Sequence, residues 1–156
     1  MKGDSMKKLV TFLTVVWLAA LLRLTVFRTG CFSHGLFSGR VEWDAFAYYV
    51  KLIRFHRWFY FTYLFVGNLV WFMPAGVLMR LYGGKLWHAA LAGFALSLLI
   101  ETAQFVLGSG LSELDDLILN TCGAVLGYWI TGVISKFCEK NNFPIDKNPH
   151  DIDNRQ

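Results

Sequence analysis

The chain has 156 residues, of which 55% are hydrophobic and only 17% are charged. A soluble domain is typically about 45–50% apolar and about 25% charged, so this composition excludes an ordinary soluble protein. Uncharged runs occupy most of the stretch from Trp58 to Ser135, which contains only six charged residues. Because about 20 apolar residues cross the hydrocarbon of a bilayer, the sequence predicts a small integral membrane protein.

The basic residues and the cysteines exclude two further classes of protein. The net charge is +4, but Lys and Arg lie in short groups beside apolar runs, which is typical of membrane flanks and not of nucleic-acid binding. The three cysteines, Cys31, Cys122 and Cys138, have neither the number nor the spacing of a disulfide framework or a zinc site. We therefore expect no nucleic-acid partner and no cysteine-bound metal.

The first predicted helix runs from Lys8 to Phe27. Its basic start and apolar stretch are similar to a signal peptide, but Arg23 stands where a small-residue cleavage site would be expected, so we predict an uncleaved helix. Arg23 and Arg28 lie near its far end, where a long cationic side chain can place its head among lipid phosphates. Residues 29–40 are rich in Gly and Ser and lack a helical period, which predicts a loop.

Helical periodicity returns in the next segment, with apolar residues at Trp43, Phe46, Ala47, Val50 and Ile53. Lys and Arg residues sit off that face, so residues 43–57 predict an amphipathic helix lying at the membrane surface. The second transmembrane helix is predicted over Tyr60–Arg80. It contains Pro74, whose ring leaves the carbonyl of Val70 without its helical partner and predicts a kink near mid-membrane.

Two further helices complete the predicted domain. Gly83 and Gly84 predict a short turn. The third helix is predicted over residues 86–107 and the fourth over residues 114–137, with residues 108–113 as the connection between them. Residues 1–137 are therefore predicted to be one all-α domain, a four-transmembrane-helix bundle with an amphipathic interfacial helix between helices one and two. Residues 138–156 are polar, contain two prolines and predict a mobile cytoplasmic tail.

The distribution of Lys and Arg predicts how the bundle crosses the membrane. If the N-terminus is cytoplasmic, the inner side carries Lys2, Lys7, Lys8, Arg80, Lys85, Lys136, Lys140 and Lys147, and the outer side Arg28, Arg40, Lys51, Arg54 and Arg57. This excess on the inner side favours a multi-pass protein of the cell membrane with both termini cytoplasmic. The acidic connection before the fourth helix then lies on the outer face.

The third and fourth helices each carry a stripe of small and polar residues. On the third helix the stripe is Ala89, Gly93, Ser97, Glu101 and Gln104, and on the fourth it is Glu113, Asp116, Asn120, Gly123 and Gly127. An ionised residue at a helix centre costs about 2.5–3.5 kcal/mol, so Glu101 requires an explanation. We expect the two stripes to face each other, with glycines allowing close approach and polar residues clustered near the outer end. Ala124 should then lie away from this contact.

Two interpretations of the polar cluster remain open. In the first, a protonated Glu101 hydrogen-bonds to Asn120 and simply holds the two helices together. In the second, the acids form a partly buried pocket that binds a partner. This partner would be a divalent cation together with a phosphate, or a lipid amine, or a proton. A structural clamp needs only one or two polar residues, so the size of the cluster favours a bound partner.

The same residues resemble a known family. The segment ETAQFVLGSGLSELDDLILNTCGAVLGYW resembles the signature of the VanZ-like family, NLVWFMPAGVL its second-helix motif and RLTVFR the end of its first helix. The family's motif residues fall on Asn68, Pro74, Gly76, Glu101, Gln104, Asp116, Asn120 and Gly123. Many members have an Arg in the turn between the third and fourth helices, where this chain has Gly110. The resemblance therefore does not imply that an Arg of this turn neutralises the acidic residues.

The resemblance implies a bacterial envelope protein that is associated, through the family's namesake, with tolerance of glycopeptide antibiotics. It implies no known reaction and no cofactor. We expect a protein that binds a lipid-linked or anionic headgroup near the outer leaflet, its partner being a membrane lipid or a lipid-linked envelope precursor. The expected ligand-binding residues are Glu101, Gln104, Glu113, Asp116, Asn120, Asn68, Arg23 and Arg28.

Two other functions remain as alternatives. An intramembrane enzyme acting on lipid phosphates would hold Mg²⁺ at Glu101, Glu113 and Asp116 and contact phosphate through Arg23 or Arg28. The sequence offers no Ser–His or Cys–His pair as a nucleophile for such an enzyme. A proton-coupled small carrier would titrate Glu101, although four helices are few for a monomeric carrier.

Overall fold

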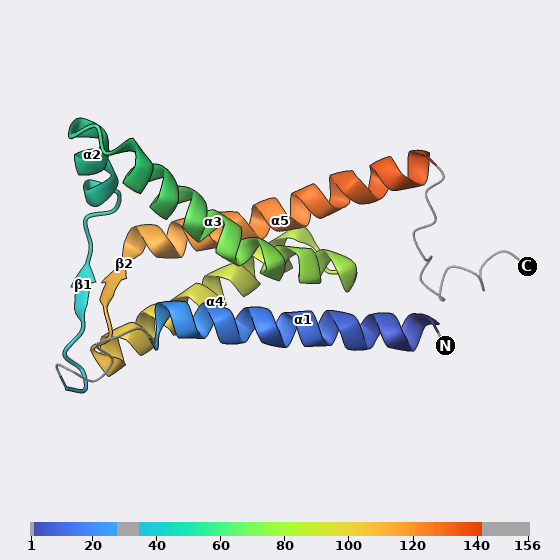
Figure 1. Cartoon of the computed structure of the whole chain (residues 1–156), viewed down its shortest axis with the longest axis horizontal. Helices are drawn as coiled ribbons and strands as arrows, with labels where there is room; N and C mark the ends of the chain where they lie inside the picture. Colours follow the sequence, from blue (N-terminus) through green and yellow to red (C-terminus); the bar gives the residue numbers. More distant parts are fainter. Residues whose placement is uncertain (1, 28–34, 142–156) are drawn as a thin grey trace, which may run out of the picture.

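The structure is a computed structural model that describes residues 2–27 and 35–141. The elements in this part of the chain are α1 (Lys2–Thr25), β1 (Arg40–Glu42), α2 (Ala47–Arg54), α3 (Trp58–Leu81), α4 (Leu86–Leu107), β2 (Leu111–Glu113) and α5 (Leu114–Lys140). The helices α1, α3, α4 and α5 are long and apolar enough to cross a membrane. The predicted all-α bundle with four candidate spans is thus confirmed (Figure 1).

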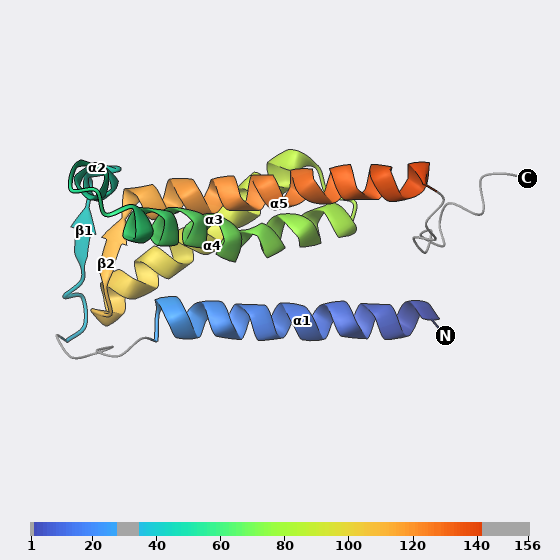
Figure 2. The same cartoon turned by 45° about the horizontal axis from the view of Figure 1, so that its top comes forward.

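The helices α3, α4 and α5 pack into one body, with α1 beside it. The most extensive contact is between α3 and α5, followed by that between α4 and α5. Figure 2 shows α1 running alongside this body, and its start and the end of α5 lie at the same end of the bundle. A small apolar core formed by Leu21, Val26, Phe72 and Ile100 joins α1 to α3 and α4. The bundle therefore has two distinct ends, of which the one at α2 carries both strands, whereas the turn between α3 and α4 lies away from it (Figure 1).

The glycines of α5 contact a different helix from the one expected. A Cβ added at Gly123 would overlap the carbonyl oxygen of Leu69, and one at Gly127 would overlap that of Met73, both in α3. The prediction that these two glycines face the third transmembrane helix was therefore wrong. Small residues spaced four apart permit close approach to any neighbouring helix, and α3 is the helix that lies on this side of α5.

The partner of α4 is instead the side of α5 that contains Ala124. This residue is completely buried, so the expectation that it lies away from the helix contacts was wrong. A Cβ on Gly93 of α4 would meet Ala124 Cβ at 2.6 Å, and a Cβ on Gly76 of α3 would overlap the Ala124 carbonyl oxygen. The α5 helix is therefore held between α3 and α4, with small residues on both contact faces.

Two segments that were predicted to be loops pair as short strands. β1 and β2 are parallel, with Arg40 opposite Leu111 and Glu42 opposite Glu113. Just before β1, the backbone N–H of Gly39 donates to the carbonyl of Phe105 at 3.1 Å, which fixes this segment to the end of α4. Strands of three residues are too short to show periodicity, and for this reason the sequence predicted loops.

The amphipathic segment contains a shorter helix than predicted. α2 covers Ala47–Arg54 instead of residues 43–57, and it is bounded by Phe46 and His56, which have left-handed φ values of 62° and 54°. Such φ values interrupt a right-handed helix, and they account for the short length. Tyr49 and Leu52 are its buried residues, whereas Trp43, Val50 and Ile53 of the predicted apolar face are exposed.

The ends of two other helices also differ from the sequence prediction. α1 begins at Lys2 instead of Lys8, and α5 extends to Lys140, so the predicted tail 138–156 begins inside α5. Residues 142–156 lie outside the described part of the chain. α3 stays continuous through Pro74, and its ribbon changes direction along its length (Figure 1), in agreement with the expected kink.

Candidate functional site

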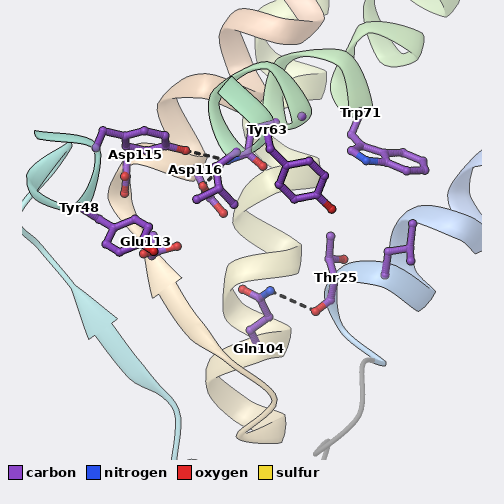
Figure 3. A pocket seen from close by; sticks show the side chains of 13 residues that line it. Thr25, Tyr48, Tyr63, Trp71, Gln104, Glu113, Asp115 and Asp116 are labelled. Carbon is purple, nitrogen blue, oxygen red and sulfur yellow. Dashed lines mark hydrogen bonds between the residues drawn. The ribbon is translucent and has the colours of Figure 1, made fainter. Parts of the chain in front are cut away.

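A polar pocket lies at the α2 end of the bundle. It has a volume of about 540 Å³, and its walls come from the end of α1, from α2, α3 and α4, and from the start of α5. The lining residues are Leu24, Thr25, Tyr48, Tyr49, Tyr63, Leu64, Gly67, Asn68, Trp71, Gln104, Glu113, Asp115 and Asp116 (Figure 3). Four of the predicted site residues, Asn68, Gln104, Glu113 and Asp116, are brought together here.

Asn68 connects three elements on one side of the pocket. Its amide nitrogen donates to Asp116 Oδ1 at the start of α5 and, at 3.4 Å, to the phenolic oxygen of Tyr49 in α2. Burial raises the pKa of the Tyr49 phenol, and the carboxylates of Asp116 and Asp115 raise it further. Tyr49 is therefore neutral at physiological pH and keeps a hydroxyl proton.

Asp115 is a lining residue that the sequence analysis missed. Only 4% of its surface is exposed, and it contributes to the wall of the pocket. It lies in the first turn of α5, where the helix dipole favours a negative charge. Adjacent residues on a helix point in different directions, so Asp115 lies off the polar stripe from which Asp116 was predicted.

Glu101 holds the strand β2 against α4. It is 8% exposed, its Oε2 accepts the backbone N–H of Glu113 at 3.0 Å, and its own carbonyl accepts the Ser112 hydroxyl at 2.8 Å. Glu101 is absent from the residues that line the pocket. It acts as a structural support for the segment that carries the pocket acids, close to the site instead of in its wall.

The expected bond between Glu101 and Asn120 is replaced by another contact. Asn120 Nδ2 donates to the Ser97 hydroxyl at 2.9 Å, within the contact between α4 and α5. Asn120 is 3% exposed and does not line the pocket. The clamp between these helices is therefore formed by Asn120 and Ser97, and the ligand role expected for Asn120 has no support from its position.

Gln104 joins the pocket to α1. Its amide nitrogen donates to the carbonyl oxygen of Thr25 at 3.2 Å, which is one of the few polar contacts of α1 with the rest of the bundle. Only 7% of the residue is exposed, and within residues 2–27 and 35–141 the amide oxygen Oε1 has no hydrogen-bond partner. Figure 3 shows the Gln104 side chain reaching into the pocket from below, with its nitrogen turned towards Thr25.

The two arginines expected at the site are not among its described lining residues. Arg23 donates to the carbonyl of Phe27 at 2.6 Å and is exposed. Arg28 lies outside the described residues. The described lining residues include three carboxylates and no Lys or Arg, so their formal charge is negative.

The residues expected to hold Mg²⁺ do not form a metal centre. Within residues 2–27 and 35–141, no three or more His, Cys, Asp or Glu side chains are grouped so that they could hold a metal ion. Glu101 in particular is directed to the backbone of β2. The arrangement of these side chains therefore gives no support to the Mg²⁺ site that the enzyme alternative assigns to Glu101, Glu113 and Asp116.

Comparison with known proteins finds no match among curated proteins and none among solved structures. A family model described as VanZ/LLP1 matches residues 9–135. This range runs from α1 into α5 and contains all the residues that line the pocket. The chain therefore belongs to the VanZ/LLP1 family.

Proposed function

We propose that this protein binds the headgroup of a membrane lipid, or of a lipid-linked envelope precursor, and thereby affects the susceptibility of the cell to glycopeptide antibiotics. The observation that carries the proposal is the pocket itself, a cavity of about 540 Å³ with acidic and aromatic walls, at one end of four helices that are long and apolar enough to cross a membrane. Its volume falls within the range of about 300–1,000 Å³ that is typical of small-molecule sites.

The position of the pocket supports a lipid as the ligand. Polar lining residues at the end of a transmembrane bundle lie at the depth of lipid headgroups, and Tyr and Trp residues are enriched at this depth. Tyr48, Tyr63 and Trp71 in the pocket wall are all at least 40% exposed. A headgroup can therefore enter the pocket while its acyl chains stay in the surrounding bilayer.

We place the pocket at the outer leaflet, with both termini in the cytoplasm. The excess of Lys and Arg on the side of the termini supports this orientation. In a variant whose only cysteine is Cys138, an impermeant maleimide should label the protein only after the cells are permeabilised. A variant whose only cysteine is introduced as Leu36→Cys, at an exposed position on the α2 side, should be labelled in intact cells. The reverse pattern would contradict this orientation.

The proposed function is tested by a glycopeptide-susceptibility assay in a susceptible bacterial host. Expression of the wild-type protein should raise the inhibitory concentration several-fold, and Asp116→Asn should abolish this increase. Asparagine keeps an oxygen that can accept the bond from Asn68, so the variant loses a negative charge while its fold survives. Asp4→Asn removes an exposed acid at the opposite end of α1 and should behave as wild type.

Glu101→Gln separates the two interpretations of the acidic cluster. Glutamine keeps an oxygen that can accept the Glu113 N–H, so membrane abundance should be unchanged. We expect unchanged tolerance, because Glu101 supports β2 and is not among the residues that line the pocket. Loss of tolerance at unchanged abundance would show instead that its negative charge contributes to ligand binding. If Asp116→Asn is as abundant as the wild type and equally protective, or if the wild type gives no protection, the proposed function is wrong.

A further inference from the structure

The pocket offers many hydrogen-bond acceptors to a ligand. Carboxylates of Glu113, Asp115 and Asp116 line it, and the described lining residues include no Lys or Arg. Acidic residues alone do not define a ligand, because local bonds can satisfy them, as the amide of Asn68 does for Asp116. The ligand must therefore be identified from a group whose bonding capacity the protein leaves unused.

Gln104 Oε1 is such a group. Gln104 itself is 7% exposed and lines the pocket, and its Oε1 has no hydrogen-bond partner among the residues that the structure describes. The amide nitrogen is committed to the Thr25 carbonyl, so the oxygen is fixed in its present direction. A buried amide oxygen without a donor is unfavourable, and a ligand in this pocket relieves the cost by presenting an N–H or O–H group.

The aromatic residues of the wall indicate that the donor is positively charged. Tyr48, Tyr49, Tyr63 and Trp71 come from α2 and α3 and surround the same cavity as the carboxylates (Figure 3). The faces of such rings attract cations, and aromatic side chains together with acids are typical of sites for ammonium groups. A cation suits the acidic and aromatic walls as well as Gln104, whereas a neutral hydroxyl donor suits Gln104 alone.

Resting on the proposed function, we infer that the headgroup bound in this pocket carries a primary ammonium group, as in an ethanolamine phospholipid. A quaternary ammonium suits the aromatic wall but has no N–H to donate to Gln104. A primary ammonium has three N–H donors, which can be shared among Gln104 Oε1 and the carboxylates of Glu113 and Asp116. The cation then joins α4 to the start of α5, next to the contact with α1.

A series of four phospholipids tests this inference directly. The series consists of phosphatidylethanolamine, its N-methyl and N,N-dimethyl derivatives, and phosphatidylcholine. All four have one phosphate and the same net charge of zero, but each successive lipid has one N–H donor fewer. Native mass spectrometry of the full chain in detergent should show binding that decreases along this series. We expect phosphatidylethanolamine to bind at least about tenfold more tightly than phosphatidylcholine, since charge-assisted bonds are lost. Phosphatidylglycerol, which has no cation, should bind more weakly than phosphatidylethanolamine.

Variants test whether the preference for ethanolamine over choline lipids arises in this pocket. Asp116→Asn should reduce the ratio between ethanolamine and choline lipids, whereas Asp4→Asn, at the far end of α1, should leave it unchanged. A preference for phosphatidylglycerol would overturn the ammonium inference and leave headgroup binding intact. Equal binding of all five lipids, unaffected by Asp116→Asn, would overturn both the inference and the proposed function. The comparison of lipids on the wild-type chain decides the matter even if Asp116→Asn does not fold.

Discussion

Replacing Gly76 by alanine should destabilise the protein by about 3 kcal/mol, the upper part of the range for overpacked sites. The added Cβ would overlap the carbonyl oxygen of Ala124 and would lie 2.6 Å from the backbone nitrogen of Tyr128. Both are backbone atoms of α5, so no rotamer change can relieve the overlap. The helices α3 and α5 would have to move apart along the most extensive contact of the bundle.

Gly67→Ala is the matched control for this change. It lies on the same helix, and a Cβ added there meets no atom within 4 Å. Alanine favours a helix over glycine by about 0.5–1 kcal/mol, so Gly67→Ala should be as stable as the wild type or more stable. Thermal unfolding in detergent, followed by tryptophan fluorescence, measures both variants. Equal midpoints for Gly76→Ala and Gly67→Ala would contradict the close packing of α3 on α5.

The sequence predicted the helices but not which of their faces meet. Length and hydropathy identify the four candidate spans because a bilayer imposes both. The spacing of Gly123 and Gly127 shows that they share a face of α5, yet it does not say which neighbouring helix covers that face. Leu69 and Met73 of α3 cover it in the structure, and they carry no distinctive pattern of their own. The pairing of β1 with β2 was missed because it depends on contacts that are distant along the chain.

For the site, the sequence predicted the charged and amide residues better than the aromatic ones. Asn68, Gln104, Glu113 and Asp116 stand out because polar groups are costly in an apolar stretch. Tyr49, Tyr63 and Trp71 do not stand out, since aromatic residues are frequent along this chain and suit the membrane interface equally well. Only the fold of α2 against α3 shows that they share a cavity with the acids.

The side-chain amide of Gln104 should respond when an ethanolamine lipid binds. The chain contains two glutamines, Gln104 in the pocket and Gln156 at the last residue, so glutamine labelled with ¹⁵N gives two side-chain amide groups. A new bond from an ammonium group to Oε1 polarises the amide and should move the Gln104 amide protons to higher chemical shift. The Gln156→Glu variant assigns the signals, and Gln156 in the wild type is an internal control.

The most direct measurement is this amide spectrum in detergent micelles titrated with phosphatidylethanolamine and, separately, with phosphatidylcholine. We expect the Gln104 signals to shift with phosphatidylethanolamine in proportion to binding, to stay in place with phosphatidylcholine, and to stop responding in Asp116→Asn. The Gln156 signals should be unchanged throughout. Binding of phosphatidylethanolamine without any change in the Gln104 signals would contradict the account, because the lipid would then occupy another part of the protein.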